Sequence, residues 1–347
     1  MKILALDLGK YKTVACEYEA ASGAHRFTTV STTPQALHDL IVEREPDRVV
    51  IEICSISGWI CDLVRALGIK IQVANTSDDV WRWRKVKQKN DRRDALKAAQ
   101  LSAVNQLREV HVPEVEIRQW RALIAYRQQL VRRRTKIKNH IRDLLLREGK
   151  LLPRAQKAWT QIGIATLEAM AQPLGDLQMR ELWRGELAVE LAQLKEIQQQ
   201  IQILEAKLNE LGAADARVRL LRTIPGVGPR LAEAIVTLLD DPTRFRNPSE
   251  VSAYIGMVPK QLDSGETERS GRITRQGNRL VRSLLVEVAW ASLRHNAWAR
   301  QSYQRISGGK KSRKKIAIVA VGRKLLVRCW AMLRDETPWH WETKVAS

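Results

Sequence analysis

The chain has 347 residues, 44% of them hydrophobic, and its 59 Lys and Arg against 38 Asp and Glu give a formal net charge of +21. This length allows two or three domains with a sizeable core. A positive excess of this size indicates a polyanionic partner and disfavours a soluble basic protein without one. Nucleic acid is the first candidate for this partner, and an anionic membrane surface is the second. No stretch approaches the ~20 apolar residues of a membrane span, and the four cysteines form no metal-binding cluster, so we expect a cytoplasmic protein.

Strand and helix patterns alternate over residues 1–110. Strands are predicted at 3–9, 13–19, 25–32, 48–54 and 70–76, with helices over 34–45, 57–68 and 91–105. Three strands in sequence followed by alternating helices and strands predict an α/β layer fold.

Four acidic residues belong to this region. Asp7 ends an apolar strand, Glu52 lies near the end of another, and Asp91 and Asp94 share one face of a helix because they are three residues apart. An acid inside an apolar strand is costly unless it is paired or binds a metal. The four carboxylates could meet at one edge of the sheet, where oxygen ligands would suit Mg²⁺ or Mn²⁺.

The helical pair of acids lies in one of the most basic runs of the chain, residues 81–94. Three cations of this run are candidates for contacts with a phosphate backbone: Lys89, Arg92 and Arg93. The structural alternative is that Asp91 caps the helix and Asp94 pairs with a neighbouring cation.

The strand and turn LDLG at residues 6–9 also occur in actin-like ATPase folds. Those folds need a second strand followed by an Asp-x-Gly turn, and the one candidate, Asp263-Ser264-Gly265, follows no apolar strand. A Walker-type glycine loop is absent. The sequence therefore disfavours an ATPase.

Residues 114–149 are predicted to form a long basic helix, in which Arg132, Arg133 and Arg134 are phosphate-contact candidates. A second long helix runs to Leu211, and its apolar residues recur at spacings of three and four. Such a seam pairs helices within a chain or between subunits, and we favour pairing between subunits. The seam consists of Leu187, Leu191, Leu194, Ile197, Ile201, Leu204, Leu208 and Leu211.

Short helices with Gly and Pro punctuation are predicted from about residue 213. The stretch 223–236 has the form of a helix-hairpin-helix, in which Gly226 and Gly228 let backbone N–H groups approach a phosphate. A tight interhelical turn is the alternative. Lys314 and Lys315, at the start of a basic closing helix, are further phosphate-contact candidates.

The segment 261–278 is predicted to be a polar loop. Ser264 precedes a glycine there, and Arg272 and Arg275 follow it, so the serine could be a nucleophile or a phosphate contact. Ser-Gly is also common in turns, and the loop holds no histidine to act as a base.

These segments together resemble the DEDD transposases of the IS110 insertion-sequence family, which includes the Piv-type and MooV-type DNA invertases. The resemblance rests on LALDLGK, VVIEIC and KNDRRDALKAA near the N-terminus, and on IPGVGPRLAEAIV, the segment 245–290 and KKIAIVAVGRKLL towards the C-terminus. It implies a RuvC-like, ribonuclease-H-type domain (1–112), a helical coiled-coil region (113–212) and a mostly helical C-terminal transposase domain (213–347).

The resemblance also implies roles for individual residues. Asp7, Glu52, Asp91 and Asp94 would be a Mg²⁺-binding tetrad, and Ser264 would form a covalent phosphoserine link to DNA, with Ser270 the weaker candidate. We expect the serine and the acids to form one composite site.

Family members are guided by a structured bridge RNA. The partners implied are therefore donor and target DNA, a guide RNA, and further copies of the chain in a dimer or tetramer. The resemblance also implies a prokaryotic cell, in which the protein lies at the nucleoid when DNA is bound. The alternatives are a RuvC-like Holliday-junction nuclease that uses water, an invertase without RNA, and a non-catalytic nucleic-acid-binding scaffold.

Overall fold

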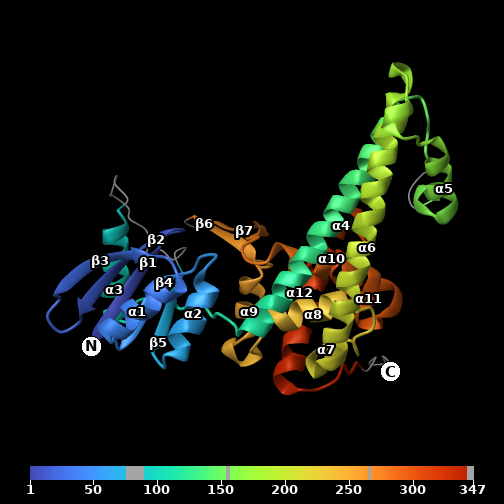
Figure 1. The fold of residues 1–347 in the computed structure, drawn as a ribbon. Helices are drawn as coiled ribbons and strands as arrows, with labels where there is room; N and C mark the ends of the chain where they lie inside the picture. Colours follow the sequence, from blue (N-terminus) through green and yellow to red (C-terminus); the bar gives the residue numbers. More distant parts are fainter. Residues whose placement is uncertain (76–89, 154–156, 265–266, 342–347) are drawn as a thin grey trace, which may run out of the picture. The chain divides into compact units, whose positions relative to one another are not determined.

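The computed structural model describes residues 1–75, 90–153, 157–264 and 267–341, and of residues 261–270 it describes only the backbone. The chain divides into two compact units, Met1–Gln119 and Trp120–Ser347 (Figure 1). Each unit has a hydrophobic core of its own. Within the described ranges, no helix is both long enough and apolar enough to cross a membrane.

The first unit is built on one mixed five-stranded sheet with the strand order β3-β2-β1-β4-β5. The first three strands pair antiparallel, whereas β1 pairs with β4, and β4 with β5, in parallel. The α/β layer fold predicted from the sequence is therefore confirmed. The elements are β1 (Lys2–Leu8), β2 (Lys12–Glu19), β3 (His25–Ser31), α1 (Pro34–Arg44), β4 (Arg48–Glu52), α2 (Ser57–Ala66), β5 (Lys70–Ala74) and α3 (Asp91–Ala103).

Helices cover both faces of this sheet. On one face, Leu4 and Leu6 of β1 pack in a cluster with residues of α1 and α2. On the other face, Ile3 and Ala5 of the same strand share a cluster with Ala95 of α3. Because β1 is buried on both sides, its sequence reads as an almost continuous apolar run.

A buried polar network fixes the end of α3 to the start of β4. The Arg48 side chain is 9% exposed, and its Nη1 donates to the carbonyl oxygen of Ser102 (3.0 Å) and to its hydroxyl (3.1 Å). The Ser102 hydroxyl in turn donates to Oε1 of Gln72 on β5 (2.6 Å). At its other end, α3 is capped by Asn90, whose side chain accepts from the Arg92 amide, so the suggestion that Asp91 is the cap is wrong.

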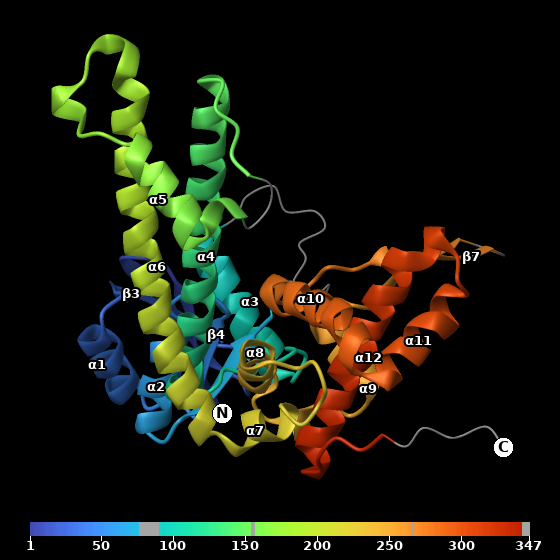
Figure 2. The same cartoon turned by 90° about the vertical axis from the view of Figure 1, so that its right-hand side faces the viewer.

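The second unit contains a long antiparallel pair of helices, α4 (Val115–Arg147) and α6 (Leu182–Ala214), which lie side by side in Figures 1 and 2. Arg127, in the first half of α4, pairs with Glu205 near the end of α6. Further along α4, Nε2 of His140 lies 2.8 Å from Oε1 of Glu186 near the start of α6. The short helix α5 (Gln161–Met170) packs on the pair.

The apolar seam of α6 is buried within the chain. Leu187 and Leu194 share a cluster with Ile141 and Leu145 of α4, and Ile201 and Leu208 are also buried. These four positions are seven residues apart, as the heptad pattern predicts. The described structure thus realises the intramolecular pairing, and pairing between subunits stays a prediction.

The rest of the second unit is a helical body around the buried helix α12, with a two-stranded hairpin. The hairpin corrects the predicted loop, because β6 and β7 pair antiparallel across that polar segment. Its strands lack an apolar alternation, which is why the pattern was not recognised as strand. The elements are α7 (Ala216–Leu221), α8 (Pro229–Leu239), α9 (Pro248–Tyr254), β6 (Pro259–Ser264), β7 (Thr267–Ile273), α10 (Arg279–His295), α11 (Ala297–Ser307) and α12 (Lys314–Asp335), with 3-10 turns at Lys157–Trp159, Leu174–Asp176, Met179–Glu181, Pro242–Arg244 and Lys311–Arg313.

Helix α8 carries a fully buried acid. Glu233 is 0% exposed, and its Oε2 lies 3.2 Å from Nη1 of Arg230 one turn earlier. Burial raises the pKa of Glu233 to about 7, against the opposing effect of Arg230 and Arg127. Gly212 of α6 leaves room for this carboxyl, because a Cβ there would stand 2.7 Å from Oε1.

Glu233 should make the stability of the protein depend on pH. Its folded pKa of about 7 lies above the ordinary value of 4.5, so the stability it contributes is complete below pH 4.5 and is lost as the pH rises to about 7. As the pH rises from 5 to 8, we expect the unfolding free energy of Glu233→Gln to increase by ~2–3 kcal/mol relative to that of the natural protein. The measurement is urea unfolding at both pH values. Glu210→Gln, exposed on α6, should show no such change; equal behaviour of the two variants would contradict the assignment.

The Arg48 network should contribute to the stability of the first unit. Arg48→Met removes the donor and leaves the Ser102 oxygens without it, so we expect a loss of ~1–3 kcal/mol in unfolding free energy. The matched control is Arg26→Met on β3, whose side chain is 61% exposed, and it should change stability by no more than about 0.5 kcal/mol. Equal urea midpoints for the two variants would show that the network does not hold α3 on the sheet.

Candidate active site and nucleic-acid interface

Asp7 and Glu52 lie at or next to the carboxyl ends of two neighbouring parallel strands. The pairing of β1 with β4 sets Leu6 opposite Ile51, so Asp7 and Glu52 stand one register step further on, at the carboxyl ends of both strands. The preceding same-face residues, Ala5 and Val50, pack in the cluster under α3. By strand alternation, both acids lie on the α3 side of the sheet, and both are half-buried.

Asp94 reaches the same end of the sheet from the covering helix. Ser102, near the end of α3, is held at the start of β4 by Arg48. The eight residues back to Asp94 advance the helix by about 12 Å, close to the ~13 Å that β4 covers from Arg48 to Glu52. Asp94 is 6% exposed and therefore lies under α3, towards the end that carries the two strand acids.

The four acids do not form a complete metal site in the described side chains. Asp91, at the first position of α3, is exposed. Within the described ranges, no group of three or more His, Cys, Asp or Glu side chains is close enough to hold an ion. Carboxylate oxygens at one sheet edge are nevertheless the donors that Mg²⁺ and Mn²⁺ accept.

Cations surround this end of α3. Burial lowers the pKa of Lys97, and the charge of Asp94 one turn away opposes that effect. The Arg92 guanidinium lies 5.8 Å from the centre of the Phe27 ring, and Arg93 is exposed. Lys89 falls outside the described residues. The pairing of Asp94 with a neighbouring cation is therefore compatible with its position, beside a role in metal binding.

The backbone places Ser264 at the end of β6. Ser264 pairs with Thr267, and Asp263 with Glu268, as the last two steps of the β6–β7 ladder. Ser270 lies on β7, where it pairs with Gln261. The choice between Ser264 and Ser270 stays a prediction.

The two candidate glycines between α7 and α8 differ in their surroundings. Gly226 has a φ of +93°, and a Cβ there would stand 2.7 Å from the Ser292 hydroxyl of α10. Packing and backbone conformation thus account for Gly226. Gly228 precedes α8 and has no atom within 4 Å of the position of a Cβ, so packing does not require a glycine there. The contact of either glycine with a phosphate stays a prediction.

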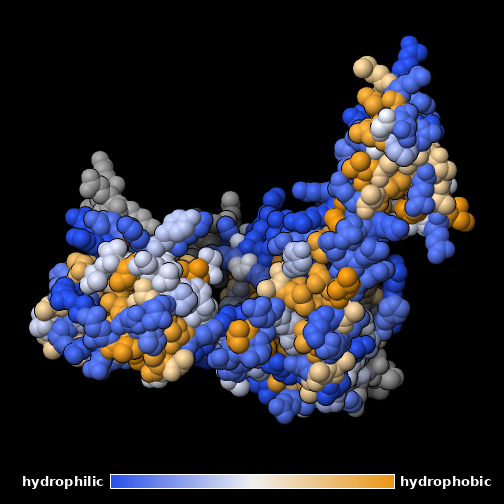
Figure 3. All heavy atoms as spheres, viewed as in Figure 1, coloured by the Kyte–Doolittle hydropathy of each residue, from blue (hydrophilic) through white to orange (hydrophobic). Residues whose placement is uncertain are grey.

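Exposed cations lie on several elements of the second unit. Figure 3 shows hydrophilic residues over much of its visible face, mixed with hydrophobic ones along the α4–α6 pair. Arg134 is half-buried, and the other predicted contacts are exposed: Arg132, Arg133, Arg272, Arg275, Lys314 and Lys315.

A hollow of about 730 Å³ adds cations that the sequence did not single out. Arg279 and Arg282 of α10 line it together with Arg275. The Arg282 guanidinium is held by the Ile255 carbonyl oxygen at 2.6 Å. Arg279 and Arg282 are three residues apart, which predicts from the sequence that they share a face of a helix. The spacing does not predict that this face is concave.

Comparison with known proteins identifies the family. Residues 4–148 match a DEDD transposase model of the IS110 type, and residues 218–304 match the transposase IS116/IS110/IS902 family. A probable family 20 transposase of Pseudomonas aeruginosa is 30% identical over 72% of this chain and 73% of its own length.

Two further relatives have similar coverage. The transposase for insertion sequence element IS1111A of Coxiella burnetii is 32% identical over 72% of this chain and 68% of its own length. Putative transposase y4rJ of Sinorhizobium fredii is 26% identical over 81% and 76%. The chain therefore belongs to the IS116/IS110/IS902 family of DEDD transposases.

Proposed function

We propose that this transposase is the recombinase of an insertion sequence, in which Asp7, Glu52, Asp91 and Asp94 bind Mg²⁺ or Mn²⁺ and Ser264 links covalently to DNA. As a transposase, the protein acts on DNA and cuts and rejoins its strands. The observation that carries the finer proposal is the register of β1 and β4, which sets Asp7 beside Glu52 on the face that α3 covers with Asp94.

The acids would act by gathering around the ion. Asp7 and Glu52 are held by the sheet, and Asp94 by a helix that is anchored at its far end, so their side chains would have to turn towards one another to share an ion. Asp91 is exposed at the first turn of the same helix and can join them from outside. A divalent cation bound there would stabilise the negative charge that develops on the scissile phosphate.

Ser264 would supply the nucleophile. Its hydroxyl oxygen forms a bond to the phosphorus of a DNA phosphodiester and gives its proton to solvent. One P–O ester bond of the DNA breaks, and the leaving oxygen takes a proton from solvent, so that one strand end is released as a free hydroxyl. The new bond to serine is itself a phosphoester, so its energy is retained and a second strand end can displace the serine. No external energy source is then needed for strand exchange.

A guide RNA fits the charge of the chain. The net charge of +21 and the basic helix α4 suit a protein that holds RNA together with donor and target DNA. In such systems base pairing reads sequence while the protein reads shape and backbone. Sequencing the nucleic acid that copurifies with the protein separates this proposal, which requires one discrete RNA, from an invertase that acts without RNA.

Contacts between copies would be made by the coiled-coil region. The segment that connects α4 with α6 exposes large apolar side chains, among them Leu151 (84%), Ile162 (81%) and Met179 (86%). Such a group favours an interface, here a dimer or a tetramer on DNA. We keep the division into domains 1–112, 113–212 and 213–347 as part of this proposal, with the helix-hairpin-helix in the last.

The main alternative is a nuclease that uses water in place of serine, as a Holliday-junction resolvase does. It would need only the acids. A scaffold without catalytic activity would need neither the acids nor the serine. The behaviour of Ser264 therefore distinguishes the proposal from both.

Ser264→Ala should abolish covalent protein–DNA adducts while DNA binding is retained, because only the hydroxyl is lost. The measurement is a denaturing gel with end-labelled donor DNA. Ser270→Ala is the matched control and should form adducts like the natural protein. Adducts that persist in Ser264→Ala would remove the nucleophile assignment, and strand cleavage without any adduct in the natural protein would favour the nuclease.

A further inference from the structure

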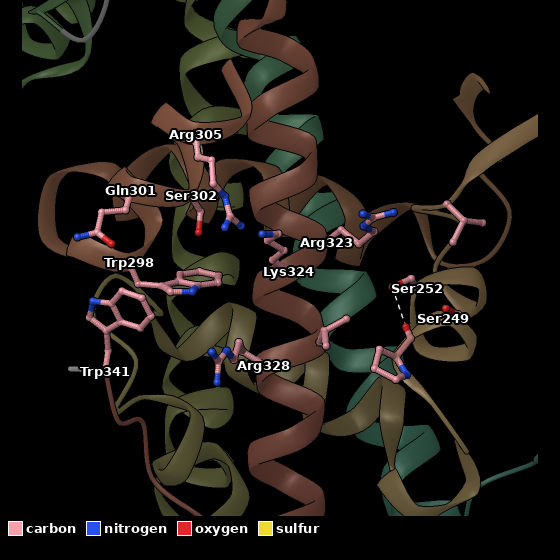
Figure 4. A pocket seen from close by; sticks show the side chains of 13 residues that line it. Ser249, Ser252, Trp298, Gln301, Ser302, Arg305, Arg323, Lys324, Arg328 and Trp341 are labelled. Carbon is pink, nitrogen blue, oxygen red and sulfur yellow. Dashed lines mark hydrogen bonds between the residues drawn. The ribbon is translucent and has the colours of Figure 1, made fainter. Parts of the chain in front are cut away.

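A second hollow in the helical body, of about 590 Å³, lies along α12 (Figure 4). Trp298, Ser302 and Arg305 line it from one face of α11, because they are four and seven residues apart. Lys324 and Arg328 form a similar stripe on α12, next to Arg323. Figure 4 shows the α11 side chains on one side of α12 and Ser249 and Ser252 of α9 on the other.

Four cations line this hollow without a carboxylate among its lining residues. Burial lowers the pKa of Lys324, and the nearby charges of Arg305, Arg323 and Arg328 lower it further. In the part of the chain that the structure describes, none of the four takes part in an ion pair. Like charges held together in this way repel one another, and an anion in the hollow would relieve that repulsion.

Aromatic rings and polar groups complete the wall. The half-buried Trp341 borders the hollow, and among the described residues its buried indole N–H has no hydrogen-bond partner. Trp298 borders it too, but Trp298 is only 6% exposed and packs edge-to-face on Trp339. Ser302 adds a hydroxyl from α11. Cations, a free donor and aromatic faces are the groups that hold the phosphate and the base of a nucleotide in single-strand binding proteins.

We propose that this hollow binds one unpaired nucleotide of a nucleic-acid strand, with its phosphate among Arg305, Lys324 and Arg328 and its base against Trp341. The volume suits a nucleotide, since small-molecule sites typically measure about 300–1,000 Å³. A base inside a duplex is stacked and cannot reach rings set in a hollow, so the strand is unpaired at this point. The proposal rests on the proposed function only in taking the ligand to be nucleic acid.

The test compares two double variants that lose the same charge. Arg305→Gln with Arg328→Gln alters the hollow, and both side chains are exposed, so folding should be kept. Lys310→Gln with Lys311→Gln changes two exposed residues outside it. Binding of labelled single-stranded RNA, single-stranded DNA and duplex DNA of equal length is measured over a range of salt concentrations, with thermal melts to confirm folding.

We expect the hollow variant to bind single strands ~10-fold more weakly than the control variant, with a salt slope smaller by about 1 for each lost contact, and to match the control on duplex DNA. Trp341→Leu, which keeps the charge, should also weaken the binding of single strands but leave the salt slope of that binding unchanged. If binding of only one kind of single strand is weakened, RNA or DNA, that kind is the ligand of the hollow.

Two results would overturn the proposal: equal single-strand binding by the two double variants, or an equal loss on duplex DNA. Should the double variant fail to fold, Lys324→Gln alone is compared with Lys311→Gln by the same criteria. Because binding is measured without cleavage, failure of the serine chemistry would leave this test intact.

Discussion

The parallel pairing of β1 with β4 is the constraint on which the candidate site depends. Its register sets two strand ends side by side, with Asp7 one residue before the end of β1 and Glu52 at the end of β4. Burial of both faces of the sheet fixes that register, since a slip by one residue would turn the apolar side chains of β1 away from their clusters. The acids therefore cannot be moved apart without disrupting the core of the first unit.

Charge is distributed unevenly over the second unit. Helix α4 is strongly basic, whereas its partner α6 has more acids than bases, and the Arg127–Glu205 contact joins them. Part of the basic surface is thereby neutralised within the pair. The cations left without acidic neighbours include those along α12, where two tryptophans accompany them. That combination of charge and aromatic surface distinguishes the hollow from a merely solvated basic face.

Much of this architecture could be predicted from the sequence, and the reasons for success and failure are physical. The central strands β1 and β4 have long apolar runs because both of their faces are buried, and such runs can be recognised in the sequence. The β6–β7 hairpin was missed because its strands pair with each other and carry polar side chains. The seam of α6 was predicted, but a periodic pattern does not say which helix covers it, and α4 of the same chain does.

In the candidate site, too, some residues could be predicted from a local sequence pattern and others depend on how helices pack. Asp7 and Glu52 are predicted because acids are rare in apolar strands, and Asp94 because it shares a helix face with Asp91 in a basic run. Arg305 and Lys324 were not selected, because they meet only when α11 packs on α12, and no local pattern encodes that contact. The close approach of Gly226 to Ser292 explains why a glycine stands there, and its contact with a phosphate stays a prediction.

The central claim is that the strand acids and Asp94 share a divalent cation, and its most direct test is anomalous scattering from Mn²⁺ in crystals of the natural protein. The account predicts a manganese peak bonded to carboxylate oxygens of Asp7, Glu52 and Asp94, which disappears in crystals of Glu52→Gln. A peak that survives that substitution unchanged, or manganese bound elsewhere with these carboxylates turned apart, would contradict it.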